Sequence, residues 1–202
     1  MKKKLFEYLD KYFPNLYNNI NVRFELGDQY ENGTDERIDQ VYERVITIFE
    51  NLFYNDDLVY IYVKDWENIS DKELDDKSTN YIYKLLNNKN YEELISIEAV
   101  ENNTDNLKKE YNIRVYEEYV SKIPYKEILK GIANYEQGRV PSIPQSIYFI
   151  NTKKDIIFNM YDDRGCIVFS NSTDKLEKIY IKYNSWIVDF WRESISDIFK
   201  TQ

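Results

Sequence analysis

The sequence of 202 residues contains no histidine and a single cysteine, Cys166. Without histidine the chain lacks the imidazole base of Ser-His-Asp and Cys-His relays, and it lacks histidine ligands for zinc, copper or haem. One cysteine excludes a disulfide framework, a four-thiolate zinc site and an iron–sulfur cluster within one chain. We therefore expect no cofactor and no metal site, and the composition argues against catalysis.

Glycine and long apolar runs are also scarce. The five glycines are scattered, so none of them belongs to a loop that could cradle a phosphate group. No run of 18 apolar residues occurs, and the basic start is interrupted at once by Glu7 and Asp10, unlike a signal peptide. Together with the free cysteine, these features predict a cytoplasmic protein without a membrane partner.

Basic residues are outnumbered, with 27 Lys and Arg against 36 Asp and Glu, so the formal net charge is −9. Nucleic acids and anionic membranes are bound through clustered Lys and Arg, so neither is an expected partner. The charge favours a basic protein as the partner, because opposite charge speeds association, or else no charged partner at all. The oligomeric state is left open.

Aromatic residues are abundant, with 20 tyrosines and the tryptophans Trp66, Trp186 and Trp191. An apolar fraction of 43% in a chain of this length is enough for a core that needs no covalent support. Tyrosine and tryptophan are also the residues that anchor protein interfaces. A tyrosine-rich acidic surface therefore suits protein binding.

Hydrophobic periodicity predicts both helices and strands. Helices are expected over residues 5–20, 34–54, 79–87, 91–97, 125–137 and 172–199, the last with a kink near Asn184-Ser185 and an apolar stripe that includes Phe190 and Trp191. Strands are expected over residues 21–26, 58–63, 113–123, 146–150, 156–161 and 166–170. This order predicts one α+β domain over residues 1–202, a sandwich of a mixed sheet with a C-terminal antiparallel meander and flanking helices. The polar middle, residues 65–110, is expected to be mobile.

The segment Tyr161-Asp162-Asp163-Arg164-Gly165 resembles part of the uncharacterised bacterial family called domain of unknown function 3885. The segments 183–189 and 195–199, and the early segments 23–26 and 40–44, are similar to the same family. The resemblance covers most of the chain and implies one domain. It implies no activity and no catalytic residues, and Trp191 stands where the family tends to have an acidic residue.

The same five-residue segment is the first candidate site. Its structural interpretation is a hairpin turn in which Asp bonds to its own backbone and Gly165 takes a positive φ. Its functional interpretation is an edge that presents two carboxylates and a guanidinium to a partner. The candidate interaction surface comprises Tyr161, Asp162, Asp163, Arg164, Gly165, Arg23, Glu25, Trp186, Asp189 and Arg192.

Three further groups are candidates for a chemical site. Arg23 and Glu25 lie on one face of their strand, as an ion pair or a solvated face. The carboxylate doublets 56–57, 75–76 and 162–163 lack the spacing of a calcium loop and are poor chelators on strands. Cys166 has no histidine to activate it and is expected to be a packed core thiol.

These observations favour a small acidic cytosolic protein-binding module, in the manner of immunity proteins that inhibit a basic toxin enzyme. One alternative is a hydrolase that uses carboxylates, with Asp162, Asp163, Glu25 and Arg164 in a cleft. Another is a regulatory domain that senses a small ligand in an apolar pocket.

Overall fold

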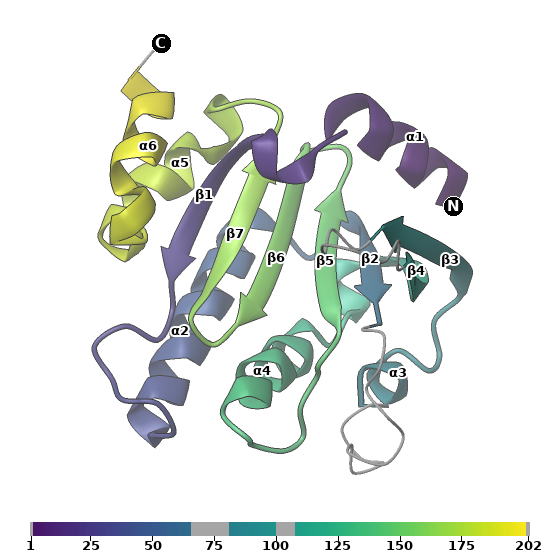
Figure 1. Cartoon of the computed structure of the whole chain (residues 1–202), viewed down its shortest axis with the longest axis horizontal. Coiled ribbons are helices and arrows are strands. Elements are labelled where there is room, and N and C mark those ends of the chain that lie inside the picture. Colours follow the sequence, from purple (N-terminus) through teal and green to yellow (C-terminus); the bar gives the residue numbers. More distant parts are fainter. Residues whose placement is uncertain (1, 66–80, 100–107, 201–202) are drawn as a thin grey trace.

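The computed structural model describes residues 2–65, 81–99 and 108–200. A seven-stranded sheet with the order β1-β7-β6-β5-β2-β4-β3 forms its centre (Figure 1). Its strands are β1 (Ile20–Glu25), β2 (Leu58–Lys64), β3 (Tyr91–Ala99), β4 (Lys108–Tyr119), β5 (Ser146–Asn151), β6 (Ile156–Asp162) and β7 (Gly165–Ser170).

Helices cover both faces of this sheet, which confirms the α+β class. In Figure 1, α2 and α4 lie behind the sheet, α1 lies in front of it, and α5 and α6 lie beside the edge strand β1. The helices are α1 (Lys2–Tyr12), α2 (Asp35–Leu52), α3 (Tyr81–Leu85), α4 (Tyr125–Glu136), α5 (Asp174–Lys182) and α6 (Asp189–Lys200), with the 3₁₀ turns η1 (Leu16–Asn18), η2 (Val120–Lys122) and η3 (Asn184–Trp186). None of the described helices combines the length and the hydropathy needed to cross a bilayer.

Every pairing between the described strands is antiparallel. The prediction of a mixed sheet is therefore wrong. The predicted C-terminal meander is confirmed as β5, β6 and β7. This meander lies between β1 and β2, the two strands joined through α2. Because four antiparallel steps separate them, β1 and β2 run in the same direction without ever becoming neighbours.

The longest helix, α2, shows how local sequence and burial agree. Thr34 caps the helix by accepting a hydrogen bond from the Arg37 backbone amide, and the acidic residues 35–36 complement the positive end of the helix dipole. Its apolar stripe packs on the sheet, where Phe49 meets the rings of Phe149 and Phe158 edge-on at 5.0 and 5.5 Å. This face of the sheet and its helices form the larger hydrophobic core.

The structure confirms the kink predicted in the C-terminal helical region and corrects the helix predicted over residues 91–97. The kink near Asn184-Ser185 is confirmed, because η3 separates α5 from α6. The helix predicted over residues 91–97 is wrong: this segment is β3 and pairs with β4 from Tyr91↔Tyr116 to Ala99↔Lys108. Pairing with a distant strand outweighed the helix propensity of its glutamates. Trp66 and the doublet 75–76 lie outside the described residues.

The second face of the sheet is covered only in part. The cross-strand row Phe169-Ile157-Ile150-Tyr60 is apolar and packs under α1, where Leu5 is buried. The next row along the strands, Arg23-Ile167-Asn159-Tyr148-Tyr62, is more polar. The apolar row lies under α1, and the polar row next to it carries charged and hydrogen-bonding side chains such as Arg23 and Asn159.

Candidate functional site

The predicted turn at the end of β6 is confirmed, and a β-bulge gives it an unusual shape. The strand register shifts between Met160 and Asp162, so Tyr161 is an extra residue in β6. Bulges redirect side chains at sheet edges and near functional sites. Here the Tyr161 ring passes over Gly165, where a Cβ would lie 2.6 Å from the Phe24 carbonyl oxygen and closer still to the tyrosine hydroxyl.

This geometry corrects the expected role of Gly165. Among the described glycines a positive φ occurs at Gly33 and Gly138, and Gly165 is not one of them. The position requires glycine because β1 and the Tyr161 ring leave no space for a Cβ.

The two aspartates of the turn are buried, so the expectation that both carboxylates are presented to a partner is wrong. Asp163 accepts a hydrogen bond at 2.6 Å from Nε of Arg37, and Nη1 of the same arginine donates to the carbonyl oxygens of Gly27 and Tyr30. Asp162 accepts hydrogen bonds from the backbone amide of Arg164 at 2.8 Å and from its Nε at 2.9 Å. Both carboxylates hold the turn in place.

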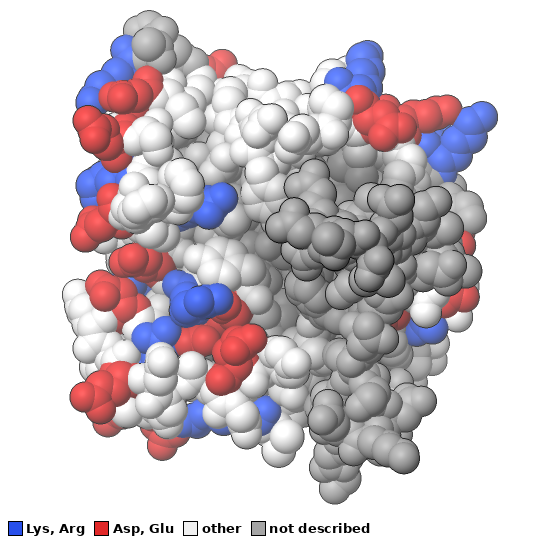
Figure 2. Space-filling model, viewed as in Figure 1, with Lys and Arg blue, Asp and Glu red and all other residues white. Residues whose placement is uncertain are grey.

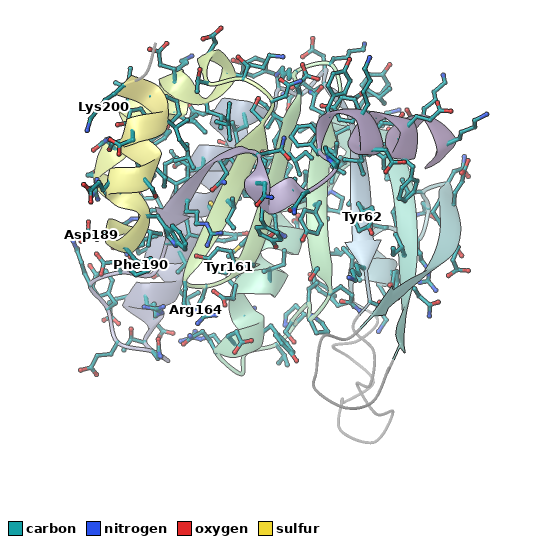
Figure 3. All side chains as sticks on the ribbon, turned by 45° about the horizontal axis from the view of Figure 1, so that its top comes forward. Tyr62, Tyr161, Arg164, Asp189, Phe190 and Lys200 are labelled. Atoms are coloured by element: carbon teal, nitrogen blue, oxygen red, sulfur yellow. The ribbon has the colours of Figure 1, made fainter. Side chains whose placement is uncertain are left out.

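A hollow lies on the open part of the second sheet face and is called the Tyr161 hollow here. It measures about 470 Å³ and is lined by Tyr17, Arg23, Glu25, Asn159, Tyr161, Arg164, Ile167 and Val188. Figure 3 shows Tyr161 and Arg164 near the hairpin end of β6 and β7. A neighbouring hollow of about 820 Å³ shares Tyr17, Asn159 and Tyr161 and extends to Tyr148 on β5. The structure therefore brings four of the predicted site residues together: Arg23, Glu25, Tyr161 and Arg164.

An aromatic contact and burial both affect the ionisable side chains that line this hollow. The guanidinium of Arg23 lies 4.7 Å from the ring centre of Trp191. Burial raises the pKa of Tyr161 to about 12, while Arg164 and Arg23 act in the opposite direction. The pKa of Glu25 is raised by burial and by Asp28 and Asp189.

Three further predicted residues, Trp186, Asp189 and Arg192, do not line the hollow. Asp189 and Arg192 form an ion pair at 2.9 Å, and Arg192 also donates to the carbonyl oxygens of Asn184 and Ile187. Trp186 stacks on Tyr183 and lies 5.1 Å from the guanidinium of Arg44. These contacts fasten the start of α6 to η3, and η3 to the end of α5 and to α2.

Two aromatic residues that the sequence placed in a buried stripe are instead exposed. Phe190 is 84% exposed and Trp191 is 39% exposed, and their rings meet edge-on at 4.9 Å. Tyr17, on η1 at the rim of the hollow, is 55% exposed. The exposure of Phe190 could have been inferred from the predicted kink near Asn184-Ser185, because a kink interrupts the helical period and ends a continuous apolar stripe.

Arginines bind two of the three carboxylates that were expected in a hydrolytic cleft. Asp162 and Asp163 are bound to arginines, and Glu25 is the remaining member of the predicted set. Among residues 2–65, 81–99 and 108–200, no group of three or more Cys, Asp or Glu side chains could hold a metal ion.

Cys166 is buried, as expected for a core thiol, and burial raises its pKa. We expect its reaction with Ellman's reagent to be slower by roughly 100-fold or more in the folded protein than in urea, because the thiolate is both scarce and inaccessible. The absorbance at 412 nm follows the reaction directly, since the chain has one thiol. Equal rates in the two states would contradict the buried position.

Comparison with known proteins gives a family and one relative. The uncharacterized protein YnaE of Bacillus subtilis (strain 168) is 25% identical over 194 residues, which cover 88% of this chain and 91% of that protein. No solved structure matches the chain significantly. The family model described as Domain of unknown function (DUF3885) matches residues 5–191, and the chain belongs to this family.

Proposed function

We propose that this protein is a binding module for another protein. Its contact surface, called the aromatic surface here, consists of Tyr17, Arg23, Tyr161, Arg164, Phe190 and Trp191. The observation that carries the proposal is the exposure of Phe190 and Trp191 next to the arginine-lined hollow. Tyr, Trp and Arg are the residues that dominate binding energy at interfaces.

Contacts within the protein orient part of the aromatic surface, namely Arg23 and Trp191. The Arg23 guanidinium packs on the Trp191 ring, and the Val188 amide donates to the Arg23 carbonyl oxygen at 3.1 Å. Phe190 then projects from the first turn of α6, as Figure 3 shows. A rigid aromatic anchor loses little conformational entropy on binding, which favours affinity.

The net charge of −9 supports a basic protein as the partner, as for an immunity protein that blocks a toxin enzyme. Figure 2 shows acidic and basic side chains interspersed along α6 and below it, with uncharged side chains between them and α1. Long-range attraction by the whole molecule and short-range contact by an aromatic area are compatible. The first sets the association rate, and the second sets the lifetime of the complex.

Photo-crosslinking tests this proposal without knowledge of the partner. A benzophenone amino acid replaces Phe190 or Tyr17 in the organism that expresses the protein. The same replacement is made at Tyr54, an exposed tyrosine just after the C-terminal end of α2. We expect an adduct with one discrete protein from positions 190 and 17 and none from position 54. Mass spectrometry then identifies the crosslinked protein.

A surface variant links the adduct to the aromatic surface. With the crosslinker at position 17, Phe190→Ser should reduce the yield at least about tenfold, since a central interface aromatic contributes 2 kcal/mol or more. Ile181→Ser, an exposed apolar residue on α5, should leave the yield unchanged. Adducts of equal yield from all positions, or from none, would contradict the proposal, and an acidic adduct protein would contradict the basic partner.

A further inference from the structure

We propose that the Tyr161 hollow binds a small anionic ligand whose carboxylate or phosphate group lies between Arg23 and Arg164 and accepts a hydrogen bond from the Tyr161 hydroxyl. This proposal goes beyond the protein-binding function and is tested on the isolated protein, although the site shares Arg23, Tyr161 and Arg164 with the aromatic surface. Arginine guanidinium groups bind such anions through paired N–H donors.

The floor of this site is built from backbone registers that place its members side by side. Arg23, Ile167 and Asn159 are direct cross-strand partners on β1, β7 and β6. Asn159 is held by a hydrogen bond at 2.9 Å from its Nδ2 to the Ile147 carbonyl oxygen. The bulge turns Tyr161 over Gly165, so its hydroxyl lies in the neighbouring row beside Glu25.

Arg23 is available to a ligand. Among the described residues no carboxylate forms an ion pair with Arg23, and its guanidinium contacts the Trp191 ring. An aromatic face orients a guanidinium and leaves its N–H donors free at the edge. Glu25 is on the same strand face, but the charges that act on its carboxylate come from Asp28, Asp189, Arg44 and Arg192.

Arg164 offers a second donor edge. Its Nε and Nη2 both donate to one oxygen of Asp162, and no described residue accepts a hydrogen bond from Nη1. The side chain is 74% exposed although one edge is fixed. The arginine is therefore oriented by the turn and still able to bind an anion.

Tyr161 completes the set as a neutral donor. Burial keeps its pKa near 12, so the hydroxyl retains its proton at neutral pH. Tyr161 lines the same hollow as Arg23 and Arg164, so a ligand in the hollow is within the reach of all three side chains. Arg164 is ion-paired with Asp162, whereas Arg23 has no carboxylate partner among the described residues, so the hollow offers positive charge to an anion mainly through Arg23.

Glu25 limits the charge of the ligand. Its carboxylate lines the same hollow, so a second negative group placed toward β1 would be repelled. We therefore expect one anionic group per ligand, with an uncharged or cationic part toward Glu25.

Side-chain NMR of the isolated protein tests the site. Acetate, inorganic phosphate and uncharged acetamide are titrated at constant ionic strength while the arginine Nε–Hε signals are followed. We expect saturable shifts at Arg23 and Arg164 with a dissociation constant of about 1 mM for acetate, phosphate or both, and none with acetamide. Saturation by acetate alone or by phosphate alone identifies which of the two groups the site takes.

Variants decide whether the shifts report this site. Arg23→Gln and Tyr161→Phe should each weaken the affinity at least about fivefold at unchanged melting temperature, and Arg23→Lys should retain part of it, since it keeps the charge and loses the fork. The matched control is Arg139→Gln. Arg139 forms an ion pair with Asp35 at 2.7 Å and does not line the hollow. No saturation, equal shifts at all arginines, or unchanged affinity in Arg23→Gln would overturn the proposal, while the crosslinking result at Phe190 would stand.

Discussion

Replacement of Asp163 by alanine should lower the free energy of unfolding by about 3–5 kcal/mol. Asp163 is 2% exposed, and its only described ion pair joins it to Arg37, which is also buried. Removing the carboxylate leaves the Arg37 guanidinium charged and away from water, with the carbonyl oxygens of Gly27 and Tyr30 as its acceptors. The uncompensated buried charge is the reason for the large loss.

Urea unfolding followed by tryptophan fluorescence measures this change. The control is Asp35→Ala, which removes an exposed partner of Arg139 and should cost less than about 1 kcal/mol. Arg37→Met combined with Asp163→Leu should recover much of the loss, since an apolar pair of similar volume needs no charge compensation. A loss below about 1 kcal/mol in Asp163→Ala would show that the pair is not buried in solution.

Replacement of Gly165 by alanine should lower the free energy of unfolding by about 2–3 kcal/mol. The new Cβ would lie 2.6 Å from the Phe24 carbonyl oxygen, and a backbone atom of β1, which is paired with β7, cannot move away alone. It would also meet the Tyr161 hydroxyl, so the ring must leave its place over β7. The substitution should therefore reduce anion binding together with stability.

Gly131→Ala is the matched control for this substitution. Its Cβ would lie 2.7 Å from both Cγ1 and Cδ1 of the buried Ile143 side chain, whereas no backbone atom is among these close neighbours, and alanine favours the helix α4. We expect a smaller loss of unfolding free energy than for Gly165→Ala in the same urea experiment, because a side chain can shift more easily than the backbone of a paired strand. If Gly165→Ala were equally mild, β1 and β7 would have to be less closely packed than the structure requires.

Much of the secondary structure could be predicted because it follows from local pattern. The apolar positions of α2 repeat with the helical period, and the three strands β5–β7 are separated by turn residues. The segment 91–97 could not be predicted, since its pattern fits either state and the decision came from pairing with β4. The strand order also depends on distant contacts, so the sequence does not indicate that the meander separates β1 from β2.

The candidate site was predicted only in part. Alternation along β1 correctly placed Arg23 and Glu25 on one face, and both line the Tyr161 hollow. The turn at residues 161–165 was also predicted, but the burial of its aspartates was not. Asp163 is neutralised by Arg37, which lies 126 positions earlier in the chain, and no local pattern reports such a distance.

The sequence by itself determined what chemistry is absent and which short segments turn, alternate or repeat. Its lack of histidine and its single cysteine are properties of composition, and they need no fold. The tertiary structure decided which charges are consumed and which remain available. Packing buries Asp162 and Asp163 against arginines, while it leaves Arg23 on Trp191 and Phe190 in water, because burial depends on neighbours brought together from distant parts of the chain.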